Sequence, residues 1–187
     1  TRTINMVQLA EALHGELLGP PVRGLYVYCS NPAAVCPDQA RVLAGLRRDD
    51  LFTVVHEQFP TDTTDYADIV LPATTHLEHF DLYGSYGHYF TQAHRAVIAP
   101  VGESKSNNDV FRLLAKRLEF EDELFQVSDE ELCRQTLDDP RFGRLTVEQL
   151  ADRGFARLNI PQDFTPFANG GFHTPSGKCE LRNDRLA

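Results

Sequence analysis

The sequence predicts an α/β fold: a Rossmann-like, open and mainly parallel sheet flanked by helices, followed by an irregular C-terminal extension. Three short apolar runs, at 24–29, 51–57 and 69–71, have the composition of buried strands. A helical pattern at 37–48 separates the first two runs, and strand, helix and strand within about 35 residues form a βαβ unit with parallel strands. These observations together favour a parallel sheet whose strands follow one another along the chain.

The elements around these strands are predicted from their own patterns. Apolar residues at helical spacing predict a helix over 4–18, which Gly19 and two prolines end. The helix at 37–48 begins at Pro37-Asp38 and has an apolar face. Residues 61–67 are expected to form a short helical turn before the third strand, which Pro72 closes.

The second half of the chain is less periodic. Glycines and aromatics crowd residues 83–90, which predicts an ordered irregular loop with a short extended segment at 89–98. Helices are expected after a cap at Asn107 or Asn108 and after the capping-box starts at 128 and 146. Residues 161–171 read as a linker, and 174–178 as a tight bend into a strand at 179–181. We therefore expect an α/β domain at 1–125, and a helical segment with a linker at 126–187.

Charge and hydropathy narrow the class of protein. The chain of 187 residues carries 18 Lys and Arg against 27 Asp and Glu, a net charge of −9. Broad contact with nucleic acid or an anionic membrane would need many basic side chains, so the negative net charge argues against both partners. No apolar run is long enough to cross a bilayer, and 1–19 lack the pattern of a signal peptide. We expect a cytoplasmic or periplasmic protein without direct membrane insertion, whose ends at Thr1 and Ala187 read as those of an internal fragment.

Polar residues follow the first two strands at the point where ligands bind in open α/β sheets. Ser30 and Asn31 lie in the turn after the first strand, where backbone amides can hold a diphosphate. Glu57 ends the second strand, and its carboxylate can accept two hydrogen bonds from a ribose diol or a guanine N–H pair, with Thr61 as a donor nearby. The alternatives are a plain Asn-Pro turn and a Glu57 that caps the following turn.

A protein-bound metal is not predicted. One alternative is a metal-dependent hydrolase built on His76, Glu78, His79 and Asp81. Their spacing is not that of an HExxH motif, however, and the side chains of a His-rich loop more often form hydrogen bonds within the protein than a zinc site. The four cysteines show no CxxC spacing, so they are expected to be ordinary thiols. They are Cys29, Cys36, Cys133 and Cys179.

Four blocks in order carry a family resemblance: SNP at 30–32, EQFPTDTTDYADIVLPATTHLEH at 57–79, the segment at 99–116 and TPSGKCEL at 174–181. The chain resembles the molybdopterin-guanine-dinucleotide oxidoreductases of the dimethyl sulfoxide reductase superfamily over about 24–181. Glu57 stands where that family more often has Asp. The resemblance implies that one set of residues lines or shapes the site of molybdopterin guanine dinucleotide: Cys29, Ser30, Asn31, Glu57, Thr61, Glu78 and His79.

The resemblance also implies that 1–125 are the domain that binds the cofactor dinucleotide, and that 126–187 lead towards a β-rich dinucleotide-binding domain that is missing from this segment. The same resemblance implies that this segment holds no catalytic residue and does not ligate the molybdenum or tungsten, and an iron–sulfur cluster is expected only in an N-terminal part outside it. Its expected partners are the remaining domains of the same enzyme and an electron-transfer subunit, and the segment alone is expected to be inactive. The alternative is a non-catalytic, stand-alone Rossmann-like module that binds a nucleotide or a partner protein.

Overall fold

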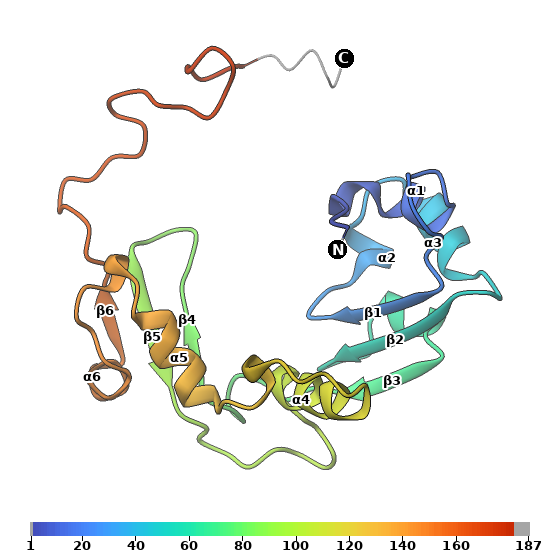
Figure 1. The fold of residues 1–187 in the computed structure, drawn as a ribbon, viewed down its shortest axis with the longest axis horizontal. Helices are drawn as coiled ribbons and strands as arrows, with labels where there is room; N and C mark the ends of the chain where they lie inside the picture. Colours follow the sequence, from blue (N-terminus) through green and yellow to red (C-terminus); the bar gives the residue numbers. More distant parts are fainter. Residues whose placement is uncertain (1, 182–187) are drawn as a thin grey trace.

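The computed structural model describes residues 2–181 and contains two three-stranded sheets, with helix α4 (Asn107–Arg117) between them (Figure 1). An α/β fold is therefore confirmed. The N-terminal sheet is parallel, as predicted, whereas the second sheet is antiparallel and was not anticipated.

The parallel sheet has the strand order β1-β2-β3, from β1 (Gly24–Tyr28), β2 (Phe52–Glu57) and β3 (Ile69–Pro72). The register pairs Tyr28 with His56 and His56 with Leu71, so the three carboxyl ends meet at one edge. The predicted strands and the predicted βαβ connection are confirmed.

Helices cover one face of this sheet: α1 (Leu9–Leu13), α2 (Pro32–Val35) and α3 (Gln39–Leu46) (Figure 1). Leu13 and Val42 are fully buried in the core that they share. The helix predicted over 4–18 is wrong in length, because a 3-10 turn (Met6–Gln8) replaces its start and Gly15 leaves the helical conformation with a φ of 71°. The predicted turn at 61–67 is the 3-10 helix η2 (Asp62–Tyr66).

Helix α4 contacts the other face of the parallel sheet. The Phe111 ring lies 5.1 Å from that of Tyr28 and 5.7 Å from that of Tyr26, between ring centroids. Ser106, rather than an Asn, caps the helix by accepting a hydrogen bond from the Asp109 N–H. Lys105 forms a parallel bridge with Ala73, which places the start of α4 at the carboxyl edge of the sheet.

The antiparallel sheet consists of β4 (Asp81–Tyr83), β5 (Phe90–His94) and β6 (Phe155–Arg157), so it draws strands from both sides of residue 125. Helices α5 (Asp129–Leu137) and α6 (Val147–Arg153) pack against it through a core that includes Cys133 and Leu150. Their predicted caps are confirmed: Ser128 and Thr146 begin the two helices, and Gly154 ends the second. Two further 3-10 turns lie at Glu123–Phe125 and Pro140–Phe142.

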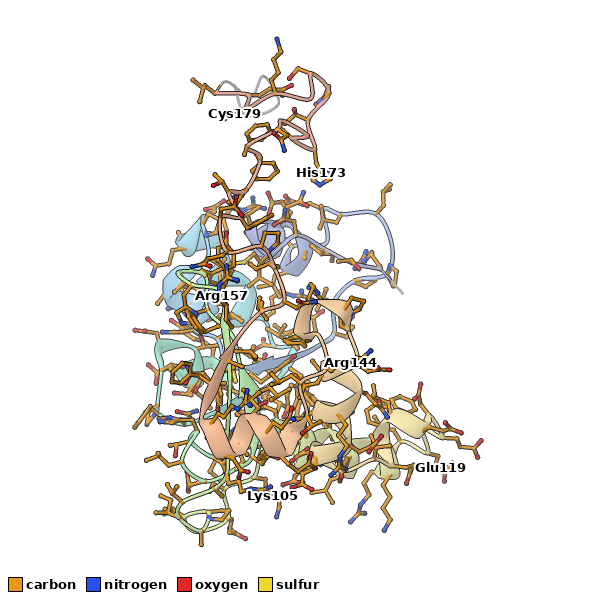
Figure 2. All side chains as sticks on the ribbon, turned by 90° about the vertical axis from the view of Figure 1, so that its left-hand side faces the viewer. Lys105, Glu119, Arg144, Arg157, His173 and Cys179 are labelled. Atoms are coloured by element: carbon orange, nitrogen blue, oxygen red, sulfur yellow. The ribbon has the colours of Figure 1, made fainter. Side chains whose placement is uncertain are left out.

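The C-terminal extension leaves the antiparallel sheet and runs away from both sheets, as Figure 2 shows for His173 and Cys179. From 158 to 181 the described chain forms turns without a helix or strand, so an irregular extension is confirmed and a strand at 179–181 is not. None of the helices described in residues 2–181 has the length and apolar composition required to cross a membrane.

Candidate functional site

The candidate site is the carboxyl edge of the parallel sheet. Residues 29–31 leave β1 there, 58–61 leave β2, and 73–75 leave β3. The start of α4 joins the same edge, where the Lys105 carbonyl oxygen lies 3.2 Å from Nε2 of the buried His56. The two motifs predicted to converge, at Ser30-Asn31 and at Glu57 to Thr61, therefore lie at one edge of the sheet.

Asn31 connects the first motif to the turn that follows the second. Its Nδ2 donates to Oδ2 of Asp62 at 2.9 Å, and its Oδ1 accepts from the Thr63 N–H at 3.2 Å and the Thr63 hydroxyl at 2.8 Å. The Asn31 side chain is thus held largely by protein groups. Ser30 is exposed beside it.

Cys29 is exposed, and its backbone has a φ of 48°, in the left-handed region that non-glycine residues seldom adopt. Its Sγ accepts a hydrogen bond from Nδ2 of Asn107 at 3.2 Å. The Oδ1 atom of Asn107 is buried and has no partner among the described residues. The sequence offered Asn107 only as a helix cap; because Ser106, one residue earlier, caps the helix instead, the Asn107 amide is free to reach Cys29.

Glu57 and Thr61 each keep a side-chain oxygen that makes no regular hydrogen bond within the described part of the chain. Oε1 of Glu57 accepts from the Gln58 N–H at 2.8 Å, so the expected capping contact exists and leaves Oε2 without a hydrogen-bond partner among the described residues. The Thr61 hydroxyl oxygen is buried and makes no hydrogen bond of normal geometry among residues 2–181, although it faces the Thr64 N–H in a capping-box arrangement. A buried hydroxyl that makes no hydrogen bond costs free energy, and native proteins leave few of them.

Glu78 and His79 lie near this edge but are bound by neighbouring protein groups. The buried Glu78 carboxylate accepts from the Thr75 N–H at 2.6 Å, the Thr75 hydroxyl at 2.8 Å and the Val101 N–H at 2.7 Å. These hydrogen bonds, led by that from the Thr75 backbone, hold the pKa of Glu78 below its usual value. Nδ1 of His79 lies 2.9 Å from the Thr74 hydroxyl, and its ring lines a small pocket of about 120 Å³ with Asn107.

His76 and His94 pack with His79 and Tyr83. The ring of His94 stacks on Tyr83 at 4.8 Å and lies 6.0 Å from that of His76 and 6.4 Å from that of His79. Within residues 2–181, no group of three or more His, Cys, Asp or Glu side chains is placed to hold a metal ion. The predicted alternative of hydrogen-bonded packing describes Glu78 and His79 as the structure has them.

Comparison with known proteins decides the family. A family model described as molybdopterin oxidoreductase matches residues 5–117, more than half of the chain. The chain belongs to the molybdopterin oxidoreductase family. The matched range contains both sheet-edge motifs and α4, and the resemblance inferred from the sequence is confirmed.

Several family relatives are larger proteins. The chain is 44% identical to the probable oxidoreductase YoaE of Bacillus subtilis over 99% of its own length and 27% of the relative. It is 33% identical to trimethylamine-N-oxide reductase 1 of Escherichia coli over 59% of its length and 13% of the relative. Acetylene hydratase from Pelobacter acetylenicus has a similar structure, with a TM-score of 0.68 at 29% identity over 94% of this chain and 24% of that one. The chain thus spans about a quarter of the length of YoaE and of the hydratase.

Proposed function

We propose that this chain binds the guanosine and diphosphate end of molybdopterin guanine dinucleotide, as a segment of a molybdenum or tungsten oxidoreductase. The observation that carries the proposal is the convergence of unused polar atoms at one sheet edge, within the range that matches the family. These atoms are Oε2 of Glu57, Oγ1 of Thr61 and Oδ1 of Asn107.

The acceptors suit the sugar and base of a guanosine. A carboxylate oxygen accepts from N–H groups of guanine or from ribose hydroxyls, and a threonine hydroxyl both donates and accepts. Glu57 is the residue of this set that can distinguish guanine from adenine, because adenine has neither the N1–H nor the amine on C2 that guanine presents side by side to a carboxylate.

The diphosphate requires donors, which a chain of net charge −9 must supply locally. Exposed Cys29 and Ser30 follow β1, and the Asn107 contact brings the N-terminus of the 11-residue α4 beside Cys29. Unpaired backbone N–H groups and the helix dipole favour an anion at such an end. The phosphates are expected between the β1 turn and the start of α4.

The reaction belongs to the cofactor and the rest of the enzyme. When bound, the cofactor supplies metal-centred oxygen-atom or two-electron transfer, while the protein orients it. We propose that this segment anchors the nucleotide end, that other domains of the same polypeptide complete the site, that an electron-transfer subunit is a further partner, and that the segment alone is inactive.

Amide-resolved NMR of the 187-residue chain, titrated with GDP and with ADP, tests the site. We expect shifts confined to 29–31, 57–61 and 106–108, with tighter binding of GDP. Glu57→Gln should weaken GDP binding about tenfold and remove the preference over ADP, since a charged acceptor is lost. The matched control Glu121→Gln, at an exposed acid after α4, should change neither. Equal binding of both nucleotides, or shifts elsewhere, would overturn the proposal.

A further inference from the structure

The turn after β2 and the loop after β1 are locked together by one buried hydroxyl and one carboxamide. Thr63 is fully buried, and its hydroxyl donates to Oδ1 of Asn31 while accepting from the Ala33 N–H at 3.1 Å. Asp62 holds the other end of the Asn31 carboxamide. The lock thus joins residues about thirty positions apart, from two different crossovers of the sheet.

The Asn31 carboxamide has little hydrogen-bonding capacity left for a ligand. A carboxamide has two N–H donors and accepts two hydrogen bonds on its oxygen. Both acceptor positions are taken by Thr63 and one donor by Asp62, so a single N–H remains. Asn31 can therefore contact a nucleotide only through that donor, and most of its hydrogen bonding serves the protein.

We infer that Asp62 and Thr63 are positioning residues that hold the dinucleotide site preformed by fixing Asn31, and through it the loop 29–31. The inference rests on the proposed function, because it concerns the same sheet edge. Thr61, with its unpaired hydroxyl, immediately precedes Asp62, and Cys29 is two residues before Asn31. The lock consequently fixes both halves of the site relative to each other.

The backbone of Cys29 explains why a lock is needed. A non-glycine residue at a φ of 48° is held there only by its surroundings, since extended or helical conformations are lower in free energy. Without the Asn31 anchor the loop would populate other conformations, and a ligand would then have to select the competent one. Apparent affinity falls by the fraction of molecules that are competent.

Four variants separate positioning from stability. Thr63→Val keeps the shape but removes the hydroxyl, and Thr63→Ser keeps the hydroxyl. Asp62→Ala removes the acceptor for Asn31. Val42→Ala, in the buried core of the same lobe and away from the edge, serves as a control for a general loss of stability.

The measurements are GDP affinity and, in the ligand-free protein, hydrogen exchange at the Ala33 amide. We expect Thr63→Val and Asp62→Ala to weaken GDP binding about five- to tenfold, the loss of roughly one hydrogen bond. Thr63→Val should also accelerate exchange at Ala33, whereas Thr63→Ser should restore both values and Val42→Ala should leave the affinity unchanged.

The outcomes distinguish a failure of this inference from a failure of the proposed function on which it rests. If wild-type protein binds GDP and all variants bind it equally well, the inference is wrong and the proposed function stands. If Val42→Ala weakens binding as much as Thr63→Val, the effect is one of stability and positioning is again refuted. If wild-type protein binds neither GDP nor ADP, the proposed function itself fails.

Discussion

Nδ2 of Asn107 donates a hydrogen bond to Sγ of Cys29 at 3.2 Å, which joins the first turn of α4 to the end of β1 across 78 residues of sequence. Oδ1 of Asn107 is buried at the same edge and has no hydrogen-bond partner within residues 2–181. One side chain therefore ties α4 to the parallel sheet and places an acceptor at the edge that we propose binds the nucleotide.

Asn107→Ala removes both roles. We expect GDP affinity to fall about three- to tenfold, the value of about one hydrogen bond, measured by isothermal titration. The neighbouring Asn108→Ala is the control, because Asn108 donates to Asp129 rather than to the sheet edge. Equal losses in both variants would indicate that helix α4 as a whole has been disturbed.

The sequence predicted the parallel half of the fold because its strands are apolar runs separated by clear turn residues. It missed the antiparallel sheet because β4 and β6 have three residues each, too few to show an alternating pattern, and β6 directly follows the cap Gly154. A pairing such as that of Phe90 with Arg157 leaves no trace in local sequence.

The sequence predicted which segments form the candidate site, but not the hydrogen bonds between their side chains. Strand ends and turn residues placed Asn31 and Glu57 at one edge of the sheet, which is a consequence of parallel topology. The atomic contacts depend on side-chain geometry that local sequence does not show. Asn31 forms hydrogen bonds with Asp62 and Thr63, about thirty residues away. The Glu78 carboxylate accepts hydrogen bonds from Thr75 and from the more distant Val101.

The Glu78 carboxylate predicts a pH dependence of stability. Hydrogen bonds from Thr75 and Val101 lower its pKa in the folded protein, so its stabilising contribution is present above the unfolded value, near 4.5, and is lost as pH falls through the folded pKa. Glu78→Gln should lower the midpoint of thermal unfolding at pH 7, and the gap from wild type should narrow in acid. A gap that is constant from pH 7 to pH 3 would contradict this assignment.

The four thiols should separate into two classes. Burial raises the pKa of the Cys133 thiol to about 11 and also raises that of Cys36, whereas Cys29 and Cys179 are exposed. Because the thiolate is the reactive form, a disulfide reagent at pH 8 should modify two thiols quickly in native protein and all four in guanidinium. The double variant Cys29→Ser, Cys179→Ser should lose the fast phase, and a remaining fast phase would show that a buried thiol is accessible.

Thr61 allows stability and binding to be separated, because its buried hydroxyl faces the Thr64 N–H but makes no hydrogen bond of normal geometry within residues 2–181. Thr61→Val removes an unsatisfied polar group at constant shape, so the free energy of unfolding should rise by about 1 kcal/mol in urea titrations. The same change should weaken GDP binding about fivefold if that hydroxyl contacts the nucleotide.

Thr64→Val is the matched control in the same turn. The Thr64 hydroxyl donates to the Thr61 carbonyl at 2.6 Å and accepts from the Thr61 N–H at 3.2 Å, so its loss should destabilise the protein. Opposite signs for the two valine variants would identify Thr61 as a residue kept for a ligand at a cost in stability, whereas destabilisation by both would mean that the Thr61 hydroxyl serves the fold.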